Sequence, residues 1–531
     1  MFWLVYGVSI LAAQAVLGPP PTHPQPRIAP DRVVVELSRP VTLGEFRAMC
    51  EGVGDGLYSI PALNTHVLRL APGLDPTRTA ERLRRLPWVR DAGPDYLLEL
   101  AHVPNDPLFG SQWDKTMVGA EAAWDITKGS SDTIIAILDT GVMLDHEDLI
   151  GQFVPGWNVQ DQNTNVYDDF WHGTRVTGVA AAIMDNNKGI AGMAPQCRYM
   201  PVKILKNGSG TVLDMAAGLT WAADNGARVC NISSVSPSGH PTLLNAVRYC
   251  VSNGVVVVAA AGNSNNTSKY YPAGYPEVIS VAASNVNDTR GWNSTYGSWV
   301  MVAAPGQDLL STGLNTPPGD YKNSTGTSYA APLVAAEAGM IYGLLAQPGE
   351  RAEWLGLAVR DIIQANVVPK DWVKYGRVNV AAALQNVFVD VSGRVTLDAW
   401  IPGPEGVVLT LQLREQGTQT VVEETAITLD DQGNYSARFR RSGEYDLVLV
   451  GGGWLNEGHA SVVLPRGQSQ FDFVTRNGDV DRSNMIDLLD INMLLQAWGL
   501  SGSRPEDVNG DGEVSLPDLS VVLINFARSG F

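Results

Sequence analysis

The segment Ile134-Ile135-Ala136-Ile137-Leu138-Asp139-Thr140-Gly141 decides the fold of this chain. Its first five residues are apolar without interruption, which is typical of a parallel strand covered on both faces. The segment Val255–Ala259 repeats the pattern. Because such strands alternate with helical stretches between residues 104 and 386, the sequence predicts an α/β domain with a parallel sheet flanked by helices.

Composition narrows the class of protein. A chain of 531 residues is expected to contain more than one domain. Its net charge of −18 argues against nucleic-acid binding, which needs clustered cations. Four cysteines are too few for a disulfide scaffold. The three that follow residue 104, Cys197, Cys230 and Cys250, cannot all pair, so we interpret them as small core thiols.

Residues 1–18 are predicted to be a signal peptide. Residues 2–13 are apolar, and Ala13-Gln14-Ala15 resembles a cleavage site. The alternative is a buried first helix. No other apolar run reaches the ~18 residues of a membrane span, so we expect a secreted or surface-attached protein without a transmembrane anchor. A proline-rich linker follows the predicted signal peptide.

Three further regions flank the α/β domain. Residues 27–100 contain alternating strands and an amphipathic helix at 79–86, which indicates a small α+β unit. Residues 387–475 alternate apolar and polar side chains between turn signals, which favours a β-sandwich. Residues 476–531 contain a duplication, because Asp479-Val480-Asp481 recurs as Asp507-Val508-Asn509 before a second apolar helix.

Four separated motifs carry the chemistry. Asp139 ends a strand, where an α/β sheet presents its reactive groups. His172-Gly173-Thr174 and Gly326-Thr327-Ser328 each open a helical stretch. A serine hydroxyl needs an imidazole base, and the imidazole needs a carboxylate that fixes its tautomer. Asn263 follows the second apolar strand and offers an amide that can donate to an oxyanion.

The order Asp139, His172, Asn263, Ser328 resembles the subtilisin family of serine proteases (subtilases), in its thermitase-like branch. The resemblance implies a serine endopeptidase acting on protein or peptide substrates. It implies that Ser328 is the nucleophile, His172 the general base, Asp139 its orienting partner and Asn263 the oxyanion donor. Three further segments fit that branch: Asn105-Asp106-Pro107-Leu108-Phe109, Ala123-Trp124-Asp125-Ile126 and Thr295-Tyr296-Gly297-Ser298-Trp299-Val300.

Two departures from the family concern specificity more than chemistry. Arg175 stands where the family often has a second histidine. Ser234 and Val235 stand where the substrate-binding strand usually reads Leu-Gly. The P1 residue of a substrate, whose carbonyl is attacked, is therefore expected to be smaller or more polar than in the family. The expected substrate edges are Ser233, Ser234 and Val235 on one side and Gly208, Ser209 and Gly210 on the other.

The resemblance also implies a propeptide at residues 19–103. Such a segment assists folding, inhibits the enzyme as a product would, and is removed by self-cleavage. The alternative is a domain that stays packed on the enzyme.

Calcium is the expected cofactor, at two places. The thermitase-like branch implies a site in the peptidase domain, and the loop at 185–189 alone would be only a turn. Six hard oxygen ligands suit Ca²⁺ better than Mg²⁺. The expected ligands are the side chains of Asp106, Asp148 and Asn186 and the carbonyls of Ile183, Lys188 and Ile190.

The duplicated tail matches two loops of the EF-hand type, at positions 1, 3, 5, 9 and 12, with a carbonyl at position 7. It resembles a type I dockerin, which implies a cohesin as partner. The alternative is a self-folding calcium cap without a partner. The expected ligands are Asp479, Asp481, Ser483, Met485, Asp487 and Asp490, then Asp507, Asn509, Asp511, Glu513, Ser515 and Asp518.

Two other classes of function stay open at this point. One is an inactive protein of subtilase fold that only binds, which the intact set of four catalytic residue types opposes. The other is a matrix-attached protein in which residues 387–531 carry the function.

Overall fold

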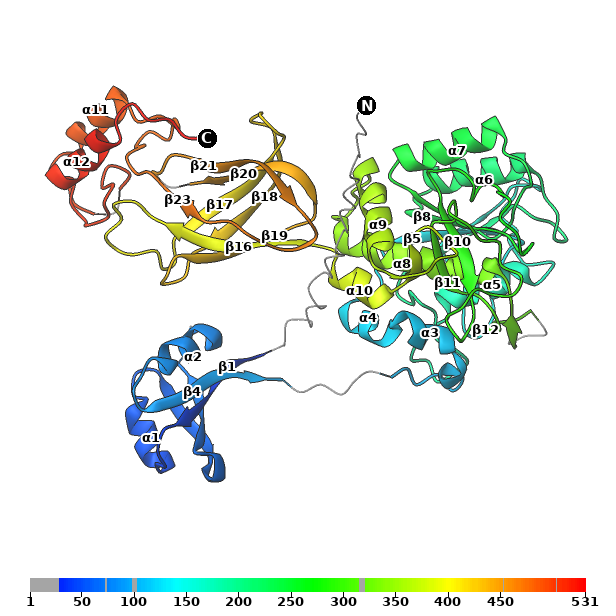
Figure 1. Ribbon diagram of the computed structural model, residues 1–531, viewed down its shortest axis with the longest axis horizontal. Helices are drawn as coiled ribbons and strands as arrows, with labels where there is room; N and C mark the ends of the chain where they lie inside the picture. The colour runs from blue at the N-terminus through cyan, green and yellow to red at the C-terminus, as the bar shows by residue number, and fades with distance from the viewer. Residues whose placement is uncertain (1–27, 72–73, 98–102, 315–319, 452, 503) are drawn as a thin grey trace, which may run out of the picture. The chain divides into compact units, whose positions relative to one another are not determined.

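The computed structural model describes residues 28–71, 74–97, 103–314, 320–451, 453–502 and 504–531 (Figure 1). The chain forms two compact units, residues 1–102 and 103–531. The predicted signal peptide lies outside the described residues. So do the proline-rich linker and residues 98–102, near the end of the predicted propeptide.

The first unit is a four-stranded antiparallel sheet with two helices, and its strand order is β2-β3-β1-β4. Val33, Val35, Phe46 and Leu68 belong to its buried core. The second helix begins earlier than the predicted residue 79, because the Asp75 carboxylate caps it and proline fits the first turn. The elements are β1 (Ile28–Leu37), α1 (Leu43–Met49), β2 (Gly54–Ile60), η1 (Pro61–Leu63), β3 (Thr65–Leu70), α2 (Pro76–Arg84) and β4 (Val89–Tyr96).

The peptidase region of the second unit contains a nine-stranded sheet in the order β14-β15-β11-β10-β9-β8-β5-β7-β6. Every neighbouring pair except β14–β15 is parallel, so the predicted parallel α/β sheet is confirmed. The strands are β5 (Ile134–Asp139), β6 (Trp157–Asn158), β7 (Arg198–Lys203), β8 (Val229–Ile232), β9 (Val256–Ala260), β10 (Ile279–Ser284), β11 (Val302–Pro305), β14 (Val367–Pro369) and β15 (Gly376–Val378).

Both faces of this sheet are buried. Ile135 and Ile137 of β5 belong to one core cluster, and Ala136 and Leu138 belong to a second. This alternation is expected where successive side chains point to opposite faces. The helices are η2 (Phe109–Ser111), α3 (Trp113–Val118), α4 (Ala120–Ile126), α5 (His172–Ala181), α6 (Val212–Asp224), α7 (Pro241–Ser252), α8 (Thr327–Leu345), α9 (Glu353–Ala365) and α10 (Val380–Gln385).

Helix α8 is the central core helix. It packs on strands β8 to β11, and it is also long and apolar enough to span a membrane. Since 89% of its most apolar window is buried within the protein, its apolar character is explained by the core. A short antiparallel hairpin, β12 (Leu309–Thr312) and β13 (Tyr321–Ser324), precedes it.

Residues 389–474 form two four-stranded sheets, β19-β16-β22 with β23 beside β16, and β18-β17-β20-β21. Apolar side chains of both sheets, such as Val391 and Leu411, form a single buried cluster. The strands are β16 (Val389–Thr396), β17 (Val408–Arg414), β18 (Val421–Thr428), β19 (Asn434–Phe439), β20 (Gly443–Val450), β21 (Glu457–Leu464), β22 (Gly467–Gln470) and β23 (Phe473–Val474).

The duplicated tail contains α11 (Leu488–Gln496) and α12 (Leu516–Ile524). Leu455, from the loop between β20 and β21, belongs to the same buried cluster as Leu494 and Val522 of the tail. The carbonyl oxygen of Asn509 accepts a hydrogen bond from the backbone nitrogen of Ile401, so the tail packs on the sheets that precede it. Much of the apolar pattern that predicted these helices is exposed, at Leu488, Leu495, Trp498, Leu523 and Phe526.

Candidate active site

Four ends of secondary structure hold the candidate catalytic side chains. Asp139 ends β5, His172 is the first residue of α5, Asn263 follows β9, and Ser328 is the second residue of α8. Gly326, just before α8, has a φ of +151° that disfavours other residues, and a Cβ there would lie 3.1 Å from the amide nitrogen of Asn263.

Asp139 and His172 are in direct contact. The Nδ1 atom of His172 lies 2.7 Å from Oδ1 of Asp139, whose side chain is almost fully buried. Burial alone would lower the pKa of His172, but the charge of Asp139 and the hydrogen bond to it outweigh burial and raise that pKa. The ionised carboxylate only accepts hydrogen bonds, so Nδ1 carries the proton and Nε2 is left as the basic nitrogen.

Ser328 is hydrogen-bonded to the predicted substrate segment. Its hydroxyl donates to the carbonyl oxygen of Ser233 at 3.1 Å, and the Ser233 hydroxyl donates to the carbonyl oxygen of Ser328 at 2.9 Å. Among the hydrogen bonds of the described residues, none joins the Ser328 hydroxyl to His172. The ring of the next residue, Tyr329, lies 5.9 Å from the His172 ring, so the start of α8 lies alongside the base. Rotation of one side-chain bond in Ser328 redirects its hydroxyl.

Asn263 is oriented by the first turn of α8. Its Oδ1 atom accepts hydrogen bonds from the backbone nitrogen of Thr327 at 2.8 Å and from the Thr327 hydroxyl at 3.0 Å. The Nδ2 group of the amide therefore stays available as a donor. The backbone N–H of Ser328 lies in the same turn, where helix N–H groups have no intrahelical acceptor. The two donors suit an oxyanion.

Asp168 is a positioning residue that the motif analysis missed. It is buried, and its Oδ1 atom accepts hydrogen bonds from the Thr140 hydroxyl at 2.8 Å and from the backbone nitrogens of Phe170 and Trp171 at 2.9 Å each. Its Oδ2 atom accepts hydrogen bonds from the backbone and hydroxyl of Thr174. Asp168 thus joins the end of β5 to the start of α5. The only available signal was an aspartate four residues before His172.

The predicted substrate edges offer accessible positions. Gly208, Ser209 and Gly210 are exposed, and the side chain of Val235 is 41% exposed. Ser233 is buried against Ser328, as described above. The hydroxyl of Ser234 is buried and has no hydrogen-bond partner among the described residues. Among the described residues, no hydrogen bond joins one edge to the other.

The predicted calcium ligands of the peptidase domain lie around one loop. Asp106 accepts hydrogen bonds from the backbone nitrogens of Asp185 and Asn186, at 3.0 and 3.3 Å. Asp148 accepts hydrogen bonds from the Asn186 amide at 2.7 Å and from the backbone nitrogen of Ile190 at 2.9 Å. Burial, together with the nearby charges of Asp106 and Glu147, raises the pKa of Asp148 to about 7.

The remaining predicted ligands of this site lie in the same loop. The backbone nitrogen of Ile183 donates to the carbonyl oxygen of Asp148, and that of Lys188 donates to Oδ1 of Asn186. Two buried carboxylates beside a loop that offers amide and carbonyl oxygens are a donor set that fits a hard cation.

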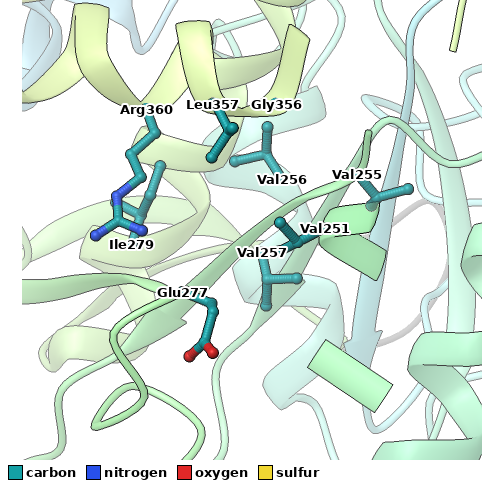
Figure 2. Close-up of a pocket in the computed structure, with 9 residues that line it drawn as sticks. All are labelled: Val251, Val255, Val256, Val257, Glu277, Ile279, Gly356, Leu357 and Arg360. Atoms are coloured by element: carbon teal, nitrogen blue, oxygen red, sulfur yellow. The ribbon is translucent and has the colours of Figure 1, made fainter. Parts of the chain in front are cut away.

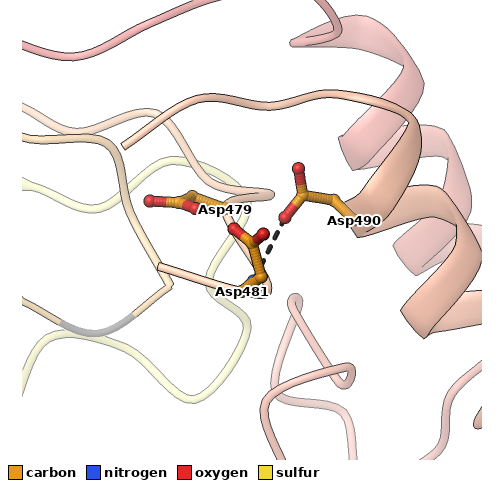
Figure 3. A group of neighbouring side chains, drawn as sticks. All are labelled: Asp479, Asp481 and Asp490. Carbon is orange, nitrogen blue, oxygen red and sulfur yellow. Dashed lines mark hydrogen bonds between the residues drawn. The ribbon is translucent and has the colours of Figure 1, made fainter. Parts of the chain in front are cut away.

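Two acidic groups occur in the tail. Carboxylate oxygens of Asp479, Asp481 and Asp490 lie within 4.8 Å of one another, and Figure 3 shows these three side chains together. Burial, aided by the charges of Asp490 and Asp481, raises the pKa of Asp479 to about 6. The second copy groups Asp507, Asp511 and Asp518 in the same way.

Other predicted ligands of the tail make local contacts. Asp487 lies outside the first group and caps α11, by accepting the backbone hydrogen bond of Leu489 at 2.6 Å. Ser515 is the cap of α12. The Ser483 hydroxyl donates to the carbonyl of Met485. In the second loop, Asn509 and Glu513 donate backbone hydrogen bonds to Asp518 and Asp511.

A separate pocket lies between α7, β9 and α9 (Figure 2). Its volume of about 20 Å³ is room for about one water molecule, so it cannot hold a peptide side chain. Its lining is Val251, Val255, Val256, Val257, Glu277, Ile279, Gly356, Leu357 and Arg360.

The α/β fold and the Asp-His-Ser arrangement define a serine peptidase. The profile of the subtilase family matches residues 130–379. Thermitase of Thermoactinomyces vulgaris is 43% identical over 287 residues, which cover 54% of this chain and all of thermitase. A thermophilic serine proteinase of Bacillus sp. (strain AK1) is 41% identical over 56% of this chain and 73% of its own.

A third relative extends the match beyond the peptidase region. The halolysin-like extracellular serine protease Nep of Natrialba magadii is 35% identical over 435 residues, which cover 79% of this chain and 75% of the relative. The chain therefore belongs to the subtilase family. It is a serine endopeptidase of the subtilisin type.

Proposed function

We propose that peptide hydrolysis in this enzyme runs through Ser328, His172, Asp139 and Asn263. The observation that carries the proposal is the 2.7 Å contact between His172 and the buried Asp139, beside the first turn of α8, which contains Ser328. With Nδ1 protonated, Nε2 of His172 takes the proton of the Ser328 hydroxyl as that oxygen attacks the P1 carbonyl. Asp139 stabilises the imidazolium that forms.

The oxyanion of the tetrahedral intermediate accepts hydrogen bonds from Nδ2 of Asn263 and the backbone N–H of Ser328. His172 then returns the proton to the leaving amine, which departs and leaves an acyl-enzyme on Ser328. Water attacks the acyl-enzyme by the same route and releases the second product. Asp168 contributes by holding the backbone on both sides of His172.

The substrate is proposed to lie as an extended strand between the edge at Gly208, Ser209 and Gly210 and the edge at Ser233, Ser234 and Val235. The exposure of Gly208, Ser209 and Gly210 supports pairing of this edge with a peptide by strand addition. Val235 and Ser234 narrow the P1 site and make it more polar.

The protein is proposed to be secreted as a precursor. The name of the extracellular relative supports secretion and a signal peptide at residues 1–18. The separate compact α+β unit supports a propeptide at residues 19–103, which inhibits the enzyme until self-cleavage.

Calcium is proposed to bind at both places where buried carboxylates gather. In the peptidase domain, Asp106, Asp148 and Asn186 would hold the ion with carbonyls of Ile183, Lys188 and Ile190. In the tail, each acidic group would hold one ion. Bound calcium supplies positive charge that offsets the repulsion between these carboxylates, and it stabilises the folded state.

The tail is further proposed to be a dockerin-like module that binds a cohesin-type protein, tethering the enzyme. The exposed apolar side chains on α11 and α12 support a docking role, because exposed apolar patches mark interaction sites. A calcium cap that has no partner is the alternative.

The test is self-processing of the purified precursor. Wild-type precursor should cut itself near residues 100–104, whereas Ser328→Ala should stay full length. Ser252→Ala, on the exposed end of α7, is the matched control and should mature like the wild type. Processing of Ser328→Ala at the wild-type rate, in the absence of other proteases, would contradict the proposal.

A further inference from the structure

Two exposed aromatic side chains, Phe170 and Trp171, directly precede the proposed general base His172. Phe170 is 37% exposed and Trp171 is 38% exposed. Their rings stack, with centroids 5.1 Å apart and planes 20° apart, and the Trp171 ring meets the His172 ring edge-on at 5.9 Å. Exposed large aromatic side chains beside a catalytic group need an explanation other than core packing.

The position of Trp171 is held at a conformational cost. Its φ is +97°, in the left-handed region where a bulky residue is an outlier. The Asp168 carboxylate accepts its backbone hydrogen bond, and the guanidinium of Arg175 lies 4.3 Å from the centre of its ring. Arg175, the departure from the family noted in the sequence, is therefore a support for the Trp171 ring.

Phe170 faces the first substrate edge. A Cβ added to Gly208 would lie 2.9 Å from Cζ of Phe170, so the ring packs directly against this glycine. Because Trp171 lies against His172 and Phe170 against Gly208, the two rings line the space between His172 and the first proposed substrate edge.

Strand geometry predicts which side chain of the substrate meets these two rings. If the P1 side chain is directed to Ser233, Ser234 and Val235, the preceding residue, P2, directs its side chain to the opposite side, since successive side chains of a strand alternate. Phe170, which packs against the opposite edge at Gly208, and Trp171, which contacts His172, are placed on that side in the proposal that follows.

We propose that Phe170 and Trp171 form an apolar wall that selects substrates with a large apolar or aromatic residue at P2. The inference rests on the proposed function, since it uses the proposed substrate edges. Phe170 contacts the P2 side chain, and Arg175 acts as a positioning residue by holding Trp171 against Phe170.

The test measures kcat/KM for peptides that differ only at P2, which is Phe, Leu, Ala or Asp, with the P1 residue taken from a library profile. Wild type should prefer Phe over Ala by about tenfold, a usual span for apolar contacts in a pocket. Phe170→Ala should lower the Phe-to-Ala ratio to within about twofold. Phe170→Leu should retain most of the preference.

Trp292→Ala is the control, because Trp292 is an aromatic residue of the same domain that is 67% exposed. It should leave the P2 profile unchanged. Inhibition of the wild type by peptide aldehydes with Phe or Ala at P2 gives the same ratio, so the proposal can be judged even where Phe170→Ala does not fold.

A flat P2 profile in an active wild-type enzyme, or an unchanged ratio in folded Phe170→Ala, would overturn the inference and leave the proposed function intact. An enzyme that cleaves no peptide of the library would instead count against the proposed function.

Discussion

The acids of the catalytic centre and the acids of the tail differ in what surrounds their carboxylates. Asp139 and Asp168 are buried, but each accepts hydrogen bonds from groups that the fold itself supplies. In the tail, Asp479, Asp481 and Asp490 also accept backbone hydrogen bonds, but their carboxylate oxygens lie within 4.8 Å of one another. Buried charge is tolerated where it is paired. Because neighbouring carboxylates repel one another, we expect the folded tail to depend on a bound cation.

The largest effect is expected at the oxyanion donor. Asn263→Ala removes one of two donors from a centre that is otherwise in place, so kcat should fall by about 10²- to 10³-fold with KM little changed. Steady-state kinetics on a peptide substrate is the measurement. Asn225→Ala, an exposed amide at the end of α6, is the control. A loss of less than about threefold would mean that Asn263 does not serve the oxyanion.

The second prediction concerns calcium and separates the two acidic regions. In full-length Ser328→Ala protein, chelation should expose the amides of residues 479–526 to hydrogen exchange. An ion at 100 times its Kd stabilises the folded state by about 2.7 kcal/mol. Asp490→Ala should mimic chelation in the tail only, and Asp148→Ala should lower the Tm of the peptidase domain only.

Asp431→Asn, in an exposed turn of the intervening sheets, controls for a general loss of negative charge. Equal protection of the tail amides with calcium and with chelator would refute the cation requirement.

The third prediction concerns Glu337, a buried acid that belongs neither to the catalytic centre nor to the tail. Glu337 is fully buried in α8, neither of its carboxylate oxygens has a hydrogen-bond partner among the described residues, and burial raises its pKa well above the usual range. The folded state therefore keeps Glu337 protonated, while the unfolded state ionises it above about pH 4.3. Stability should fall as pH rises from there, by up to about 1.4 kcal/mol per unit, until the folded-state pKa is reached.

Glu337→Met removes this titration at similar volume. It should raise the free energy of unfolding at pH 7 by about 1–4 kcal/mol and flatten its decline with pH. Denaturant unfolding at pH 5, 7 and 9, in a Ser328→Ala background that prevents autolysis, is the measurement. Parallel stability curves for the two proteins would show that Glu337 is not held neutral.

The smallest effect is expected at Val235, in the proposed binding site for the P1 side chain. Val235 is exposed beside the catalytic centre and partners no charge, so Val235→Gly should leave turnover of small P1 residues unchanged. It should raise kcat/KM for Phe or Leu at P1 by about three- to tenfold. A library profile of the wild type that is already dominated by Phe, Tyr and Leu would contradict this prediction.

Local pattern was enough for the fold and for the candidate catalytic residues. Asp139, His172 and Ser328 each lie at the end of an element whose apolar pattern and glycine neighbours are visible in sequence, so their places on a strand and on two helix starts were predictable. The parallel sheet followed from uninterrupted apolar strands, because only burial on both faces accounts for them.

Other features depend on contacts between segments far apart in sequence. Asp168 reaches Thr140 across 28 residues, and the Thr327 N–H reaches Asn263 across 64. The stacking of Arg175 on Trp171 depends on a backbone conformation that no propensity predicts for tryptophan. The apolar spacing of α11 and α12 predicted the helices but not which side is covered, because burial there is decided by the sheets that the tail packs on.

The sequence by itself thus determined the class of fold and predicted the reacting groups, since these depend on residue type and on the local periodicity of strands and helices. The calcium ligands of the peptidase domain were predicted from the resemblance to the family. The tertiary structure decided how the carboxylates are partnered, which aromatic rings stand beside the base, and that Glu337 is buried alone. The physical reason is that partnering and burial are properties of the packed chain, set by segments that meet only after folding.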